Sequence, residues 1–212
     1  MNAKRFLLIV SASFLGWSAS HANVTSIPTW NYRGGIYCYA PVLTTDSGTG
    51  DQAVTLKGNQ SGFGAMDLTL ITDTPSDPTL TLNNSINNTS SFAWTEYIVN
   101  VAMNQTFSIN SAGVVAPSGW AANITQPGAP VSGIYTGTID FTGGVPVAVF
   151  PALNSTLDFG YQVTFAGATQ YSLTESASPV PEPGAPGLLL LSGLLLGGQM
   201  VAKRRQAVRR PF

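Results

Sequence analysis

The sequence predicts an all-β domain between residues 23 and 178, a single antiparallel β-sandwich of the jelly-roll or immunoglobulin-like kind. Helix-forming residues are scarce in this stretch, and no apolar run repeats at helical spacing for three turns. Residues 157–165 instead alternate apolar side chains with polar or small ones, which is typical of a strand with one face on a core. Clusters of Gly, Pro, Asn and Asp separate such runs, so we expect short strands joined by turns. A barrel remains an alternative.

The expected strands follow one another along this domain. They cover residues 35–40, 66–72, 79–83, 92–103, 105–109, 131–141, 157–165 and 170–174. Turn-forming clusters at 73–78, 83–91 and 126–130 interrupt them. No period of about 20–50 residues repeats, which argues against a solenoid or propeller and for one domain.

Residues 1–22 have the features of a signal peptide. Lys4 and Arg5 form a short positive region, an apolar run follows over residues 6–17, and Ser20-His21-Ala22 has the small-x-small pattern of a cleavage site. Because roughly 20 apolar residues are needed to span a membrane, this run is too short for an anchor. The sequence therefore predicts export, with cleavage after Ala22.

Export would leave the domain without histidine, because the only histidine lies in the predicted signal peptide. Histidine-activated nucleophiles and the commonest zinc ligand are then missing. Cys38 is the only cysteine, so no internal disulfide can form, and we expect it to be a small apolar strand residue. Asp46 and Asp51 flank a glycine-containing turn with too few further acids for a calcium loop. We expect no metal, no cofactor and no enzymatic activity.

The other end of the chain, residues 179–212, has the layout of a membrane signal. A proline-rich segment that should break any strand is followed by sixteen uncharged, mostly apolar residues at 187–202. The basic residues Lys203, Arg204 and Arg205 come next. This order predicts a single short transmembrane helix whose basic end stays on the cytoplasmic side.

The tripeptide Pro181-Glu182-Pro183, the apolar helix and the basic stop, in this order, resemble the PEP-CTERM sorting signal of Gram-negative bacteria. The resemblance covers about residues 179–205. It implies that a membrane enzyme of the exosortase type processes the chain near the tripeptide. It also implies transient anchoring in the inner membrane, followed by sorting to the cell surface or the extracellular exopolysaccharide matrix.

Charge is distributed unevenly along the chain. Residues 23–180 contain two basic residues, Arg33 and Lys57, and nine acidic ones, which gives a net charge of −7, although the whole chain has −1. Such a domain lacks the cations needed to neutralise phosphates, so we expect no nucleic-acid partner.

For the exported domain we expect a structural or adhesive role in an exopolysaccharide or biofilm setting. One alternative is a carbohydrate-binding module, because sugar rings stack on exposed aromatic faces; Trp120, in a loop-like context, and Trp30 are the candidate contacts. A weaker alternative is a glycoside hydrolase that uses two carboxylates, for which Glu96 among aromatic residues is the best candidate acid.

Overall fold

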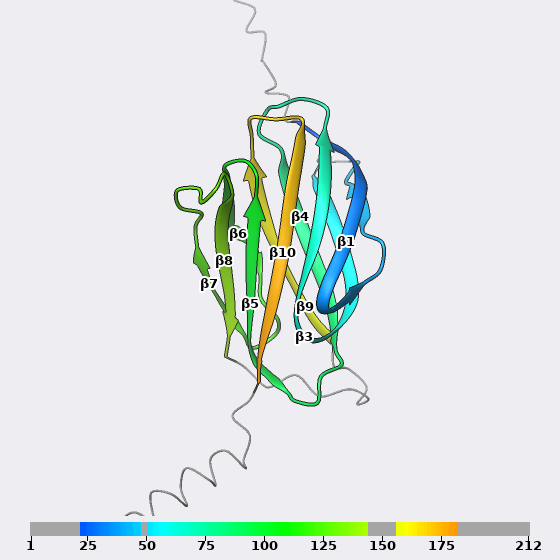
Figure 1. Cartoon of the computed structure of the whole chain (residues 1–212), viewed down its shortest axis with the longest axis vertical. Helices are drawn as coiled ribbons and strands as arrows, with labels where there is room; N and C mark the ends of the chain where they lie inside the picture. The colour runs from blue at the N-terminus through cyan, green and yellow to red at the C-terminus, as the bar shows by residue number, and fades with distance from the viewer. Residues whose placement is uncertain (1–21, 48–50, 144–155, 182–212) are drawn as a thin grey trace, which may run out of the picture.

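The structure, a computed structural model, describes residues 22–47, 51–143 and 156–181, and these residues form ten strands and no helix (Figure 1). The prediction of an all-β domain is therefore confirmed. The strands are β1 (Val24–Cys38), β2 (Val42–Thr45), β3 (Gln52–Thr72), β4 (Thr79–Asn88), β5 (Trp94–Met103), β6 (Phe107–Val115), β7 (Ala121–Thr125), β8 (Tyr135–Thr142), β9 (Thr156–Phe165) and β10 (Gln170–Pro181).

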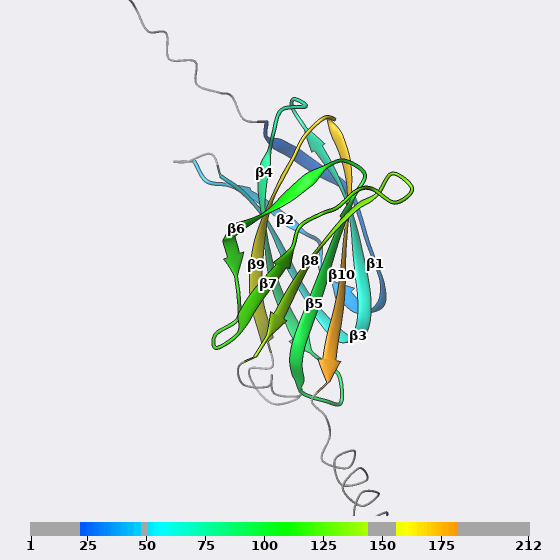
Figure 2. The ribbon, with the colours of Figure 1, turned by 90° about the vertical axis from the view of Figure 1, so that its left-hand side faces the viewer.

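The strands form one mixed, nearly closed sheet (Figure 2). Its order is β6-β9-β4-β3-β10-β5-β8-β7, and β1 and β2 also pair with β3. Every pairing between named strands is antiparallel except that of β3 with β4, which is parallel over Gln52–Gln60 and Leu80–Asn88. The expectation of a purely antiparallel sheet is thus wrong at this pair, and the two-sheet sandwich stays a prediction.

The parallel pair arises because β3 doubles back on itself. Fully extended, its 21 residues would span about 70 Å. Yet Thr72, at its end, pairs with Val24, and the side chain of Gln52, at its start, bonds the same Val24. Gln52 accepts the Val24 backbone N–H at 2.5 Å and donates to the Val24 carbonyl at 2.8 Å. The two ends of β3 therefore meet, and the short segment 73–78 suffices to start β4 beside the first half of β3.

A side chain also links β6 and β7, the first and last strands in the order of the sheet. The amide of Gln126, just after β7, accepts the backbone N–H of Ile109 in β6 at 2.9 Å and donates to the Ile109 carbonyl at 2.6 Å. These two bonds replace the backbone pairing that β6 and β7 do not make with each other. The sheet is in this way held nearly closed around a single core.

The core consists of the inward-facing side chains of the sheet. In β9, the alternation seen in the sequence is confirmed, since all five apolar residues are buried: Leu157, Phe159, Tyr161, Val163 and Phe165. The ring of Phe159 lies 5.1 Å, centroid to centroid, from both Tyr97 of β5 and Phe141 of β8. Aromatic rings from three strands thus fill the middle of the molecule.

Strand β10 continues into the predicted proline-rich segment. Pro179 pairs with Tyr97, and Pro181 with Trp94, so the expectation that this segment breaks any strand is wrong for residues 179–181. The position of these prolines at an edge of the sheet explains why the strand continues. Pairing of β10 with β3 ends at Ala177, so that one side of β10 is unpaired beyond it, and proline is tolerated at such an edge.

Candidate functional site

Most of the predicted targeting residues lie outside the described part of the chain. This holds for Glu182, Pro183, the expected helix at 187–202 and the basic residues Lys203, Arg204 and Arg205, whereas Pro181 is the last residue described. Within the described ranges, no helix is long and apolar enough to cross a membrane.

At the other end, Ala22 is buried, and Asn23, the next residue, contacts Asp73. The Asn23 backbone N–H donates to Asp73 Oδ1 at 2.8 Å, and its side-chain amide donates to Oδ2 at 3.2 Å. These hydrogen bonds, the backbone one foremost, lower the pKa of Asp73.

The three tryptophans of the domain lie in different environments. Trp94 is fully buried, and its indole N–H donates to Ser90 Oγ at 3.1 Å, so it is a structural core residue. Trp120, the first candidate for sugar contact, is half-buried and packs against the core. Trp30, the second candidate, is 37% exposed. Of the two, Trp30 offers the larger free aromatic surface.

Trp30 belongs to a row of four aromatic rings on and just after β1, each in contact with the next. We call Trp30, Tyr32, Tyr37 and Tyr39 the β1 aromatic row. Its ring centroids are separated by 6.1 Å from Trp30 to Tyr32, 5.0 Å from Tyr32 to Tyr37 and 5.7 Å from Tyr37 to Tyr39. Tyr37 and Tyr39 are about half exposed, whereas Tyr32 packs partly against the core. Among the described strands, β1 pairs only with β3, so its other edge is unpaired.

A glycine bend brings the two halves of the row together. In a regular strand, Tyr32 and Tyr37 would point to opposite faces, because they are an odd number of residues apart. Between them, however, the pairing with β3 shifts register after Gly34, whose φ is +75°. Gly35 lies so close to β3 that an added Cβ would be 2.9 Å from the Gly62 nitrogen. The bend therefore requires glycine at both positions, and it places Tyr32 beside Tyr37.

Both basic residues of the domain lie near this row. Arg33, next to Tyr32, forms an ion pair with Asp67 of β3, and Asp67 also accepts the Thr174 hydroxyl at 2.6 Å. Lys57 is exposed on β3, and its carbonyl accepts the backbone N–H of Tyr39 at 2.8 Å.

Glu96, the candidate catalytic acid, lies on β5 beside Asp140 of β8. Its pKa is raised, first by desolvation and then by the charge of Asp140 and a hydrogen bond with that carboxyl. Asp140 Oδ1 is buried without a hydrogen-bond partner. A glycosidase pair stands about 5–10 Å apart with the sugar between the two carboxyls. Neither Glu96 nor Asp140 lines a surface hollow among those that the described residues form. This geometry does not favour hydrolysis.

A second polar cluster lies inside the sheet, around Glu175 of β10. Its carboxyl accepts the hydroxyl of Tyr161 at 2.6 Å and the side-chain amide of Asn84 at 3.4 Å. Burial raises the pKa of Glu175 to about 7, although both hydrogen bonds act in the opposite direction. Burial, and then the charge of Glu175, raise the pKa of the Cys38 thiol to about 12, so Cys38 is an unreactive core residue as expected. Sequence reasoning missed this cluster, because Glu175 resembles an ordinary surface acid in its Ser- and Thr-rich surroundings.

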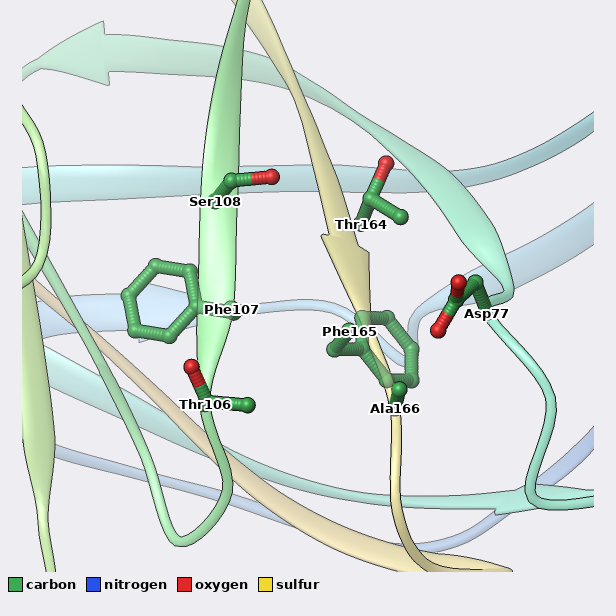
Figure 3. Close-up of a pocket in the computed structure, with 7 residues that line it drawn as sticks. All are labelled: Asp77, Thr106, Phe107, Ser108, Thr164, Phe165 and Ala166. Atoms are coloured by element: carbon green, nitrogen blue, oxygen red, sulfur yellow. The ribbon is translucent and has the colours of Figure 1, made fainter.

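Three surface hollows lined by described residues contain few charged or reactive side chains. The one in Figure 3, of about 270 Å³, lies where β6 begins and β9 ends, and its single charged group is Asp77. A hollow of about 240 Å³ contains Asp158, and one of about 390 Å³ contains Asp46 and Asp51. Neither Glu175 nor the Glu96–Asp140 pair lines any of the three. In the described ranges, no group of three or more His, Cys, Asp or Glu side chains is arranged to hold a metal ion.

The β1 aromatic row is thus the surface feature best suited to binding. Comparisons of the chain with protein-family models, curated proteins and solved structures gave no match.

Proposed function

We propose that this protein is an exported adhesive component of the cell surface or exopolysaccharide matrix and that it binds polysaccharide through the β1 aromatic row. The observation that carries the proposal is the run of four contacting rings, of which Trp30, Tyr37 and Tyr39 are between one third and about one half exposed to solvent. Sugar rings have apolar faces that stack on such side chains, and a row of them can hold successive sugars of one chain.

The sorting part of the proposal rests on the terminal segments. The resemblance of residues 179–205 to a PEP-CTERM signal indicates an exosortase-type processing enzyme as a partner and the outer surface as the destination. The contacts of Asn23 are consistent with cleavage after Ala22. Cleavage there would turn the Asn23 nitrogen, 2.8 Å from Asp73 Oδ1, into a positively charged terminus beside a carboxylate, which is a favourable pair.

A glycan array tests the binding proposal. We expect the full chain, purified in detergent, to bind at least one polysaccharide, and Trp30→Ala to weaken that binding about tenfold because a stacking surface is lost. Trp120→Ala should leave binding unchanged, since Trp120 packs on the core and is not part of the row.

Val131→Ala is the matched control, because Val131 is 78% exposed in a loop outside the row. A blank array, or equal losses in the Trp30 and Trp120 variants, would contradict a binding site at β1.

A further inference from the structure

The rings of the β1 aromatic row do not lie in one plane. Trp30 and Tyr32 are inclined by only 29°, but the angle is 67° between Tyr32 and Tyr37 and 87° between Tyr37 and Tyr39. A flat ligand surface, such as the face of a crystalline polysaccharide, can stack only on rings that share a plane. A single chain is different, because rotation about its glycosidic bonds lets successive sugars turn with the rings.

The charges around the row offer little net positive charge. The guanidinium of Arg33 is neutralised by Asp67. Lys57 pairs with Ser85 on β4, and Ser85 pairs with Asp158 on β9, so Asp158 lies two strands away, about 10 Å across the sheet. This distance exceeds the screening length of about 8 Å at physiological ionic strength, so Asp158 offsets the charge of Lys57 only weakly. Lys57 is nevertheless a single cation on a domain whose net charge is −7. A polyanionic glycan would therefore gain little attraction here.

A second copy of the chain is a poor match for the same surface. A large aromatic side chain offers about 150–250 Å², and Trp30, Tyr37 and Tyr39 are 37%, 48% and 55% exposed, so these three rings present roughly 200–350 Å². A stable protein interface takes about 800 Å² from each partner. The row is of a size for a few sugar units rather than for another protein.

We propose that the β1 aromatic row binds single chains of an uncharged polysaccharide, and that the Gly34–Gly35 bend sets the arrangement of its rings. This inference rests on the proposed function and specifies its ligand. Tyr32 and Tyr37 are the central pair, because they join the two halves of the row across the bend.

Affinity electrophoresis of the full chain in detergent tests the ligand class, with gels that contain soluble uncharged glucans or mannans, or soluble polyuronates. We expect retardation by an uncharged polymer that does not change with added salt, no retardation by polyuronates, and no sedimentation with crystalline cellulose. Salt-sensitive retardation by polyuronates, or adsorption to the crystalline polymer alone, would overturn the inference while leaving a carbohydrate-binding function in place. Failure with every glycan would instead contradict the proposed function.

Variants locate the site. Tyr37→Ala should weaken retardation about tenfold, and Tyr37→Phe should preserve it, since the ring and not the hydroxyl does the stacking. Gly35→Ala should weaken it as well, by forcing β1 away from Gly62. If Gly35→Ala fails to fold, the result with Tyr37→Ala tests the location of the site by itself, because this change alters only a half-exposed side chain. If size-exclusion chromatography shows a dimer that Tyr37→Ala dissociates, the row is a protein interface and the inference is wrong.

Discussion

At the scale of single residues, the clearest departure from sequence expectation is Glu175. A carboxyl inside an apolar core costs free energy when it is ionised, and here only a tyrosine hydroxyl and one amide compensate. At neutral pH, the protein therefore contains a carboxyl close to its titration midpoint in the middle of its core.

This arrangement predicts that stability depends on pH in an unusual direction. The pKa of Glu175 is about 7 in the folded protein and ordinary, 4.5, in the unfolded chain, so the folded state binds the proton more tightly. Its contribution to the free energy of unfolding is complete below pH 4.5 and declines as the pH rises to about 7, by about 3 kcal/mol in all. Glu175→Gln should remove this decline. Urea unfolding of both proteins between pH 4 and 8 measures it.

The comparison between the two proteins matters, because carboxyls with a lowered pKa, such as Asp73, change stability in the opposite direction. Both proteins contain these carboxyls, so their effects cancel in the difference between the two free energies of unfolding. A difference that stays constant with pH would show that Glu175 keeps an ordinary pKa.

At the scale of elements, the bent strands β1 and β3 organise the molecule. The start and end of β3 meet at Val24, where the side chain of Gln52 bonds both backbone groups and also donates to Thr45 Oγ1 at 3.2 Å. Gln52 is buried, so the groups that it satisfies have little access to water. This one side chain links residues that are 28 positions apart in the sequence.

We therefore expect Gln52→Ala to lower the free energy of unfolding by about 2–3 kcal/mol, since it leaves the Val24 N–H and carbonyl without partners in the interior. Gln126→Ala, at the other closure of the sheet, is a useful comparison, because its bonds to Ile109 are only partly buried. Gln126→Ala should therefore lower the free energy of unfolding less than Gln52→Ala does. Thermal unfolding followed by circular dichroism ranks the two, and equal or negligible losses would contradict the role assigned to Gln52.

These same strands mark the limit of what the sequence could predict. The alternation in residues 157–165 identified β9 and its five inward residues, because a regular strand obeys a simple period. Gly58, Gly62 and Gly64 lie in the bent part of β3, where the sequence predicts no strand. The parallel pairing with β4 depends on that bend, and so does the contact of Tyr32 with Tyr37. Trp30 could be proposed from the sequence, whereas the row that contains it required the fold.

At the scale of the whole molecule, the uneven charge suggests that the terminal segments and the domain between them have different roles. Seven of the nine basic residues lie in the two terminal segments, and the domain between them is acidic. If the terminal segments are targeting signals, the mature protein is far more acidic than the full chain. We expect a solvated, anionic surface that keeps the domain soluble outside the cell.

Intact-mass spectrometry of the exported protein tests this processing. The expected product begins at Asn23 and ends near Pro181–Pro183, without the residues from 187 onward. A product that extends to Phe212 would contradict removal of the tail, and one that retains Met1 would contradict the signal peptide. The full chain from the cytoplasmic fraction serves as the mass control.

If the C-terminal segment anchors the chain in a membrane as proposed, the extension of β10 to Pro181 limits how far the domain can stand from that membrane before processing. Only residues 182–186 separate this strand from the expected membrane helix, and five residues reach at most about 17 Å. Gly34 pairs with Gly64, which pairs with Ala177, only four residues or about 13 Å before the end of β10. While it is tethered, the protein would hold its aromatic row close to the lipid surface, where a long polymer has little room. Cutting the tether would then release the domain and also open its binding surface to the matrix.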